Sequence, residues 1–342
     1  MRRGWTVLTG AVLLLALATG LTSMPVPYVA LGPGPTVDTL GKSDGKPIIQ
    51  VTGHETSTSR GHLNLTTVSV NDGLDLGTAV RLWINDDVAV VPREFVYPPD
   101  RSPRQTDKQN AEEFAQSQSS AETAALRELG YPVLVTVEGL TTDSPSAGKL
   151  RVGDVITSVD GKPVTSRANL FARLFARAPG DTVTVGYRRG SDHGTVRVVA
   201  GKAPDDSERA LLGVNVGQKQ PHPFTISIGL EKIGGPSAGL MFALGIIDKL
   251  DPADLTGGTF VAGTGTIDED GAVGPIGGIP QKLVAARRAG ATVFLTPAAN
   301  CAEAAARIPA GLRLVKVTSL DDALGALRQL REKTGSPAGC TS

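Results

Sequence analysis

Cysteine, histidine and aromatic residues are scarce in this chain of 342 residues. The sequence has two cysteines, Cys301 and Cys340, four histidines and 4% aromatic residues, while 40% of its residues are hydrophobic. Two cysteines are too few for a zinc cluster, and the histidines lack metal-ligand spacing. We therefore expect no metal and no other cofactor, and hydrophobic cores that are mainly aliphatic.

Net charge is absent as well. The 34 basic residues balance the 34 acidic ones, and the formal net charge is +0 at pH 7. Such a chain has no overall field to attract the phosphate backbone of a nucleic acid. We therefore expect no nucleic-acid partner. The length of 342 residues favours two domains.

The sequence also lacks a histidine after Ser237. Ser237 stands in Gly-Pro-Ser-Ala-Gly at 235–239, which fits the nucleophile elbow G-x-S-x-G of α/β-hydrolases. In that fold the histidine base follows the serine, whereas the last histidine of this chain is His222. A serine hydroxyl needs a base in order to act as a nucleophile. The base must therefore be a different residue type.

The residues around Ser237 predict a turn followed by a buried helix. Gly235, Pro236 and Ala238 form the expected turn, and the run 238–248 is apolar on nearly every face. Ser237 would then lie at the amino end of that helix, where backbone N–H groups are unpaired. Such groups can stabilise the oxyanion of a tetrahedral intermediate.

Lys282 is the best-placed candidate for the base. Pro280 is typical of the first turn of a helix, here expected at 281–289, and this would place Lys282 in the first turn. The positive end of the helix dipole and burial both disfavour an ammonium ion there. A neutral amine can accept the proton of Ser237, so the sequence predicts a Ser-Lys dyad.

The stretch 264–283 resembles the signature of the Lon protease family that ends in its catalytic lysine, which falls on Lys282. Ser237 falls on the family's serine, and Thr264 on a threonine that lies close to the dyad and helps to orient it. The likeness covers about 210–330, and implies a mixed α/β proteolytic fold and a serine endopeptidase.

Two further segments bear on this resemblance. Residues 289–300 are similar to the family's strand and asparagine-bearing turn, and Gly234 stands where the family usually has an acidic residue. Lon proteases normally carry an ATPase module with the motif G-x-x-x-x-G-K-[ST]. The nearest segment here is Gly41-Lys42-Ser43, but Thr36 occupies the position of the first glycine. The resemblance therefore implies a peptidase that does not depend on ATP.

The amino terminus predicts a membrane segment. Arg2 and Arg3 precede an uncharged, mostly apolar run at 5–21. Positive charge before such a run keeps the amino end in the cytoplasm. The run is at the lower limit for a bilayer span and slightly longer than a usual signal-peptide core. We favour an uncleaved signal anchor in the lipid bilayer over a cleaved signal peptide; either places the rest of the chain outside the cytoplasmic membrane.

Residues 132–201 resemble bacterial PDZ domains in the order of their strands and in a Gly-Asp-Val-Ile strand and Val-Asp-Gly-Lys hairpin. An amphipathic helix is expected at 167–178. PDZ domains bind extended peptides by adding a strand beside a helix. Leu170, Phe171 and Leu174 lie on this helix and are candidates both for the peptide groove and for the ordinary core.

The resulting fold class is an α/β (α+β) Lon proteolytic domain interrupted by a small β-rich PDZ-like domain, with an N-terminal transmembrane helix. We favour this insertion over a separate β-rich amino-terminal domain. The expected parts are a signal anchor at 1–24, a linker at 25–47, the first part of the proteolytic fold at 48–130, the PDZ-like domain at 131–202, the catalytic region at 208–333 and a flexible tail at 334–342.

Two functional classes remain open. The first is a membrane-anchored serine endopeptidase of the bacterial YlbL-like type, with protein or peptide substrates selected by the PDZ-like domain and homo-oligomerisation as a possibility. The second is a non-catalytic PDZ scaffold outside the cytoplasm. In an oxidising compartment Cys301 and Cys340 have the option of pairing, although no sequence rule fixes the distance between them.

Overall fold

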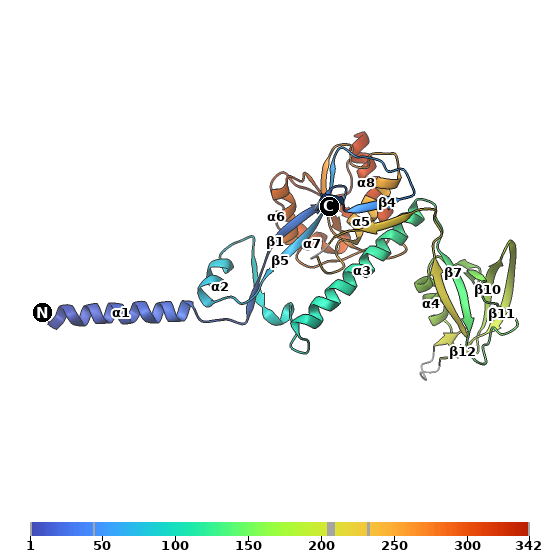
Figure 1. Ribbon diagram of the computed structural model, residues 1–342, viewed down its shortest axis with the longest axis horizontal. Coiled ribbons are helices and arrows are strands. Elements are labelled where there is room, and N and C mark those ends of the chain that lie inside the picture. The colour runs from blue at the N-terminus through green and yellow to red at the C-terminus, as the bar shows by residue number, and fades with distance from the viewer. Residues whose placement is uncertain (1, 44, 204–208, 231–232, 341–342) are drawn as a thin grey trace. The chain divides into compact units, whose positions relative to one another are not determined.

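A computed structural model of the chain describes residues 2–43, 45–203, 209–230 and 233–340 (Figure 1). The chain forms two compact units. Unit 1 consists of Met1–Glu122 and Ile226–Ser342, and unit 2 of Thr123–Thr225, so that unit 2 lies within the sequence of unit 1. The predicted start of the catalytic region at residue 208 and the last two residues of the predicted tail lie outside the described residues. The predicted end of the PDZ-like domain at residue 202 is too early, because unit 2 continues to Thr225.

A six-stranded mixed sheet forms the centre of unit 1, in the order β20-β19-β16-β5-β1-β6. The four strands β20, β19, β16 and β5 run parallel to one another, whereas β1 is antiparallel to both of its neighbours, β5 and β6. The bounds are β1 Tyr28–Asp38, β5 His62–Asn71, β6 Ala89–Pro92, β16 Phe260–Gly263, β19 Val293–Pro297 and β20 Arg313–Val317. All five residues of β19 are buried, as expected for a parallel strand covered on both faces.

The predicted linker at 25–47 is wrong in its central part, because Tyr28–Asp38 is the long strand β1. Its Gly/Pro content suggested a linker, since proline lacks the N–H that a strand donates. The register with β5 shifts between Pro33 and Thr36, so the prolines are tolerated at an irregularity of the ladder. Gly34 is required there because a Cβ would lie 2.4 Å from the Thr67 hydroxyl.

Helices cover this sheet and connect its strands. The helix α5 packs against β4 and β5, and α6 against β1 and β5. α6 connects β16 to the parallel strand β19, as a crossover helix does. After the amino-terminal helix α1 (Arg2–Thr22), the described helices of unit 1 are α2 Leu76–Trp83, α3 Pro103–Glu128, whose last turns belong to unit 2, α5 Gly239–Leu250, α6 Ile279–Ala289, α7 Cys301–Ala305 and α8 Leu320–Glu332, with short 3₁₀ turns at Arg93–Phe95 and Ala298–Asn300.

Four short strand pairs complete the ladders. They are β2 with β3 (Lys42–Ser43, Lys46–Pro47), β4 with β15 (Ile49–Thr52, Thr225–Ile228), β17 with β18 (Thr266–Ile267, Val273–Gly274) and, in unit 2, β12 with β13 (Gly201–Lys202, Ala210–Leu211). The β17–β18 hairpin lies between the last residue of β16 and α6. It therefore connects two elements that carry site residues.

The amino-terminal segment forms the helix α1 at Arg2–Thr22. Within the described part of the chain, no helix is both long enough and apolar enough to cross a membrane. The helical state of this segment agrees with the sequence prediction, but the transmembrane assignment is not supported.

Unit 2 contains a five-stranded antiparallel sheet in the order β11-β10-β8-β7-β14, with β9 paired to β8. Its strands are β7 Leu134–Leu140, β8 Val155–Val159, β9 Lys162–Pro163, β10 Thr182–Arg189, β11 Asp192–Val199 and β14 Val214–Lys219. The helix α4 (Arg167–Phe175) contacts β14 and β8. Ser166 caps this helix by accepting a hydrogen bond from the Asn169 N–H. Aliphatic side chains such as Val183 and Val185 fill the core, in line with the low aromatic content.

The carboxyl-terminal tail is ordered where it is described, contrary to the prediction of a flexible tail. Cys340 forms a disulfide with Cys301. Ala338 accepts a hydrogen bond from the Lys316 N–H of β20, and the Arg313 guanidinium donates to the Ser336 hydroxyl. Tertiary contacts therefore order a segment whose composition alone is typical of a loose end.

Candidate active site and peptide groove

Ser237 lies in a tight turn that precedes α5. Gly235 has a φ of 83°, in the left-handed region that glycine adopts without strain, and its N–H donates to the Asn110 carbonyl. The Ser117 hydroxyl of α3 donates to the Pro236 carbonyl at 2.9 Å. Two hydrogen bonds from α3 residues thus fix the turn and the serine that follows it.

Lys282 reaches the serine from the first turns of α6. Its Nζ lies 2.8 Å from Ser237 Oγ and 2.9 Å from Thr264 Oγ1. The α6 helix begins at Ile279, two residues earlier than the sequence predicts, and the Lys282 N–H donates to the Gly278 carbonyl. The three residues that the sequence singled out for catalysis therefore lie within hydrogen-bonding distance of one another.

Burial changes the acidity of Lys282. Its side chain is almost completely enclosed, with 3% of the residue exposed. Desolvation lowers the pKa of its ammonium group from 10.5 to about 8. The described residues place no carboxylate in an ion pair with it. A substantial fraction of the amine is therefore neutral in mildly alkaline solution and has a free lone pair for the serine proton.

Thr264 connects the two members of the pair. It is fully buried, its hydroxyl accepts from Lys282 Nζ, and it donates to the Ser237 carbonyl at 2.9 Å. The next N–H, that of Gly265, donates to the same carbonyl. Thr264 therefore contacts both the lysine amine and the serine backbone, the position that an orienting residue requires.

The oxyanion donors differ in part from the prediction. The N–H of Gly235 is already used by Asn110, and Pro236 has no N–H, so both serve the turn and neither can donate. Ala238 precedes the first helical residue of α5. In the described part of the chain, no acceptor pairs with the N–H groups of Ser237 and Ala238. These two groups are the available donors for a developing oxyanion.

A cavity of about 690 Å³ opens over the pair. Most of its lining comes from residues 65–68 of β5, the serine turn at 233–238 and the segment Pro275, Ile276 and Gly277 before α6, and Pro35, Thr266 and Lys282 complete it. Among the described residues, no group of three or more His, Cys, Asp or Glu side chains is arranged to hold a metal ion. The arrangement suits an extended chain whose carbonyl carbon approaches Ser237.

A second hollow, of about 430 Å³, lies within unit 2. Leu170, Phe171 and Leu174 of α4 line it, opposite Val214 and Val216 of β14. Leu170 and Leu174 are also buried core residues, whereas Phe171 is partly exposed. Because β14 is an edge strand of the sheet, its outer side is unpaired by other strands of the described chain.

Sequence reasoning missed two contributors to these sites. Phe175 stacks on Phe171 with ring centroids 6.1 Å apart and lines the hollow of unit 2; its spacing of four residues from Phe171 on an amphipathic helix was the available signal. Asn300, noted only as part of a turn, holds the Ile276 backbone of the active-site cavity through two hydrogen bonds. Nothing in the local sequence indicates that contact, since the two residues come together only in the folded chain.

Two protein-family models match this chain, one in each of these two regions. The model of the Lon protease (S16) C-terminal proteolytic domain matches residues 228–328, and the model of the PDZ domain matches residues 114–199. Lon protease 1 of Sorangium cellulosum is 37% identical over 127 residues, which are 36% of this chain and 15% of that protein. A probable periplasmic serine endoprotease, DegP-like, of Pseudomonas fulva is 37% identical over 84 residues, 24% of this chain and 18% of that protein.

Among solved structures, the PDZ domain of an SdrC-like protein from Listeria innocua is 27% identical and covers 26% of this chain and 98% of that chain, with a TM-score of 0.23. This chain spans less than a fifth of the length of the two curated relatives. The residues matched to the proteolytic model include Ser237, Thr264 and Lys282. The chain thus combines a region similar to the proteolytic domain of Lon serine proteases with a region similar to PDZ domains.

Proposed function

We propose that this protein is a serine endopeptidase in which Ser237 is the nucleophile and Lys282 the general base. The observation that carries the proposal is the buried amine of Lys282, 2.8 Å from Ser237 Oγ, with a pKa lowered to about 8. A serine next to a desolvated lysine meets the requirement for an activated hydroxyl. The matches to Lon proteases over the same residues support this reading.

The chemistry follows from the geometry. In its ammonium form Lys282 donates to Ser237 Oγ, whereas its neutral form takes the serine proton as Oγ forms a bond to the substrate carbonyl carbon. The carbonyl oxygen becomes an oxyanion, which the N–H groups of Ser237 and Ala238 are placed to stabilise. The lysine then gives its proton to the leaving amine as the C–N bond breaks. Water, deprotonated by the same amine, hydrolyses the acyl ester and restores Ser237.

The proposal includes protein substrates delivered by unit 2. An extended peptide added beside β14 would place its side chains against Leu170, Phe171 and Phe175 of α4. Main-chain hydrogen bonds to an edge strand give affinity that depends little on the amino-acid sequence of the bound peptide. Such binding suits the capture of substrate tails. No nucleotide is required by any of these steps, so we expect hydrolysis without ATP.

We also propose that the protein acts outside the cytoplasm, as a Lon-like peptidase of the YlbL-like type held at the membrane by α1. The Cys301–Cys340 disulfide supports an oxidising compartment, and Arg2 and Arg3 before the apolar run support export with the amino end inside. Protease added to wall-free cells should digest the protein, and membrane fractionation should show whether it stays attached.

The catalytic proposal is tested with the purified full chain and an unfolded protein such as reduced, alkylated casein, without nucleotide. We expect the wild type to produce new amino termini, and the Ser237→Ala and Lys282→Arg variants to produce none. Arginine remains protonated and cannot act as the base. Full activity in folded Lys282→Arg would refute the mechanism. Peptide binding without any turnover by the wild type would favour a scaffold instead.

A further inference from the structure

Asn300 does not line the Ser237 cavity, but its side chain is hydrogen-bonded to Ile276, which does. Asn300 is buried, with 6% exposed, and ends the 3₁₀ turn Ala298–Asn300 after β19. Its Oδ1 accepts the Ile276 N–H at 2.9 Å, and its Nδ2 donates to the Ile276 carbonyl, also at 2.9 Å. Both main-chain groups of Ile276 are therefore held by one side-chain amide.

Ile276 occupies a position that matters for the cavity. With Pro275 and Gly277 it forms one wall, opposite the serine turn. Its side chain packs against the core cluster that contains Ile279 and Leu283 of α6. Lys282 follows six residues later, so the segment fixed by Asn300 leads directly into the helix that carries the base.

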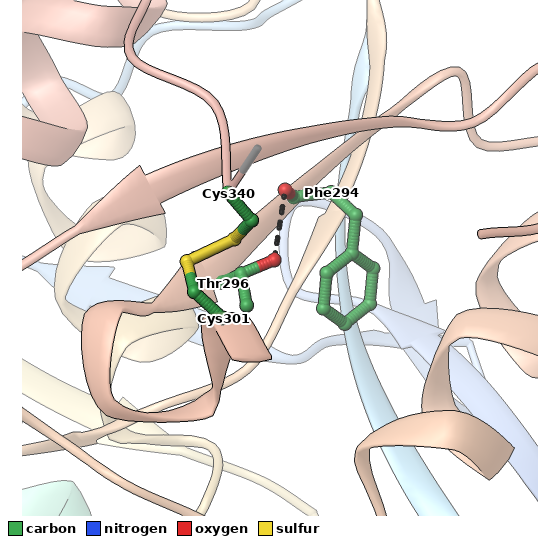
Figure 2. Close-up of a disulfide and its surroundings, with 4 residues drawn as sticks. All are labelled: Phe294, Thr296, Cys301 and Cys340. Carbon is green, nitrogen blue, oxygen red and sulfur yellow. Dashed lines mark hydrogen bonds between the residues drawn. A yellow bond between two sulfur atoms is a disulfide. The ribbon is translucent and has the colours of Figure 1, made fainter. Parts of the chain in front are cut away.

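Cys301, the residue after Asn300, is held by a covalent bond to the carboxyl-terminal tail. Cys301 is the first residue of α7 and forms the disulfide with Cys340, which Figure 2 shows joining the short helix to the chain terminus. The tail is fixed to β20 by the Lys316 N–H bond to Ala338. Cys340 also packs against the same core cluster as Ile276. The tail and the cavity wall are thus linked through two consecutive residues, Asn300 and Cys301.

We propose that Asn300 is a positioning residue for substrate binding, and that the Cys301–Cys340 disulfide holds it in place. Its amide keeps residues 275–277 as a fixed wall of the Ser237 cavity. The inference rests on the proposed peptidase function. Because Asn300 does not touch Ser237 or Lys282, its loss should weaken substrate binding more than it slows the chemical step.

The test compares Asn300→Ala and Asn300→Asp with the wild-type full chain. Asn300→Ala leaves residues 275–277 without their two side-chain hydrogen bonds, so the substrate must pay for ordering this wall and KM for a peptide substrate should rise, by roughly tenfold. The change in kcat should be less than about threefold, and labelling of Ser237 by a small fluorophosphonate should keep its rate. Ser59→Ala is the control, because it removes the hydroxyl proton shared between the two carboxylate oxygens of the buried Asp248, and neither residue lines the Ser237 cavity.

Asn300→Asp supplies a second readout that a purely structural role would not give. Its carboxylate can still accept the Ile276 N–H but, when ionised, has no proton for the Ile276 carbonyl. Protonation of the introduced carboxylate restores a donor for the Ile276 carbonyl. The ratio of variant KM to wild-type KM should therefore fall as the pH is lowered, and taking the ratio cancels the titration of Lys282.

The disulfide is tested by reduction with dithiothreitol. KM of the wild type should rise on reduction, while the Cys301→Ser/Cys340→Ser variant should already have the raised KM and not respond. Unchanged KM in folded Asn300→Ala, or an equal loss in Ser59→Ala, would overturn the positioning role. If reduction leaves KM unchanged, the disulfide does not hold Asn300 in place. If the wild type itself shows no turnover, it is the proposed function that fails.

Discussion

Replacing Lys282 with methionine should abolish turnover and yet raise the free energy of unfolding at neutral pH. The ammonium group of Lys282 is buried with 3% exposed, and its pKa is lowered from 10.5 to about 8 by desolvation. At about 1.36 kcal/mol per pKa unit, this difference corresponds to a penalty of about 3 kcal/mol for the charged form in the folded state. Methionine has a similar length and no charge, so it removes the penalty.

The pH dependence gives the sign of the effect. Below about pH 8 both the folded and the unfolded wild type carry the lysine proton, and the folded state bears the whole penalty. Between about pH 8 and the unfolded pKa the unfolded state binds more protons, so wild-type stability rises with pH. The advantage of Lys282→Met should therefore be largest at neutral pH and decrease as the pH approaches 10.

Lost hydrogen bonds offset part of this gain. Methionine cannot donate to Ser237 Oγ or Thr264 Oγ1, and each lost bond costs about 1 kcal/mol. The net stabilisation at pH 7 should be about 1 kcal/mol, measured by urea unfolding at several pH values. Lys282→Arg is the matched control, because it keeps the buried charge and should be less stable than Lys282→Met throughout. A difference between wild type and Lys282→Met that does not change with pH would refute the argument from desolvation.

Three further outcomes are expected. Thr264→Val should lower kcat by about 10–100-fold, because valine lacks the hydroxyl that bonds the Lys282 amine and the Ser237 carbonyl. Thr264→Ser keeps this hydroxyl and should retain most of the activity. Equal kcat values in the two variants would exclude the orienting role. Phe171→Ser with Phe175→Ser should weaken peptide binding to unit 2 in calorimetry and raise KM for protein substrates more than for a short peptide, and a uniform effect would contradict a recruiting groove. Replacing Cys301 and Cys340 by serine should lower the free energy of unfolding by about 2–4 kcal/mol, since the disulfide closes a loop of 39 residues, and unchanged urea unfolding would contradict this.

The sequence singled out Ser237 and Lys282 as candidate catalytic residues because turns and helix starts are specified by neighbouring residues. The glycines around Ser237, the apolar run after it and Pro280 before Lys282 each specify a turn or a helix start from neighbouring residues alone. The groove helix followed from the amphipathic spacing of Leu170 and Leu174.

Other features depended on contacts between distant parts of the chain. The segment 25–47 is typical of a linker by composition, yet β5 and β6 pair with both edges of Tyr28–Asp38 and make it an inner strand. The tail is polar, but β20 and Cys301 hold it. Asn300 and Ile276 are 24 residues apart, and neither identity indicates the other.

The sequence by itself therefore determined which residues can do the chemistry and which local elements carry them, because turns, caps and helical faces are set by neighbouring residues. Only the tertiary structure decided how acidic Lys282 is, which N–H groups near Ser237 are left to donate, and which side chains hold the cavity wall. The physical reason is that desolvation and hydrogen-bond pairing depend on what is packed around a group, and packing brings together residues that the sequence keeps far apart.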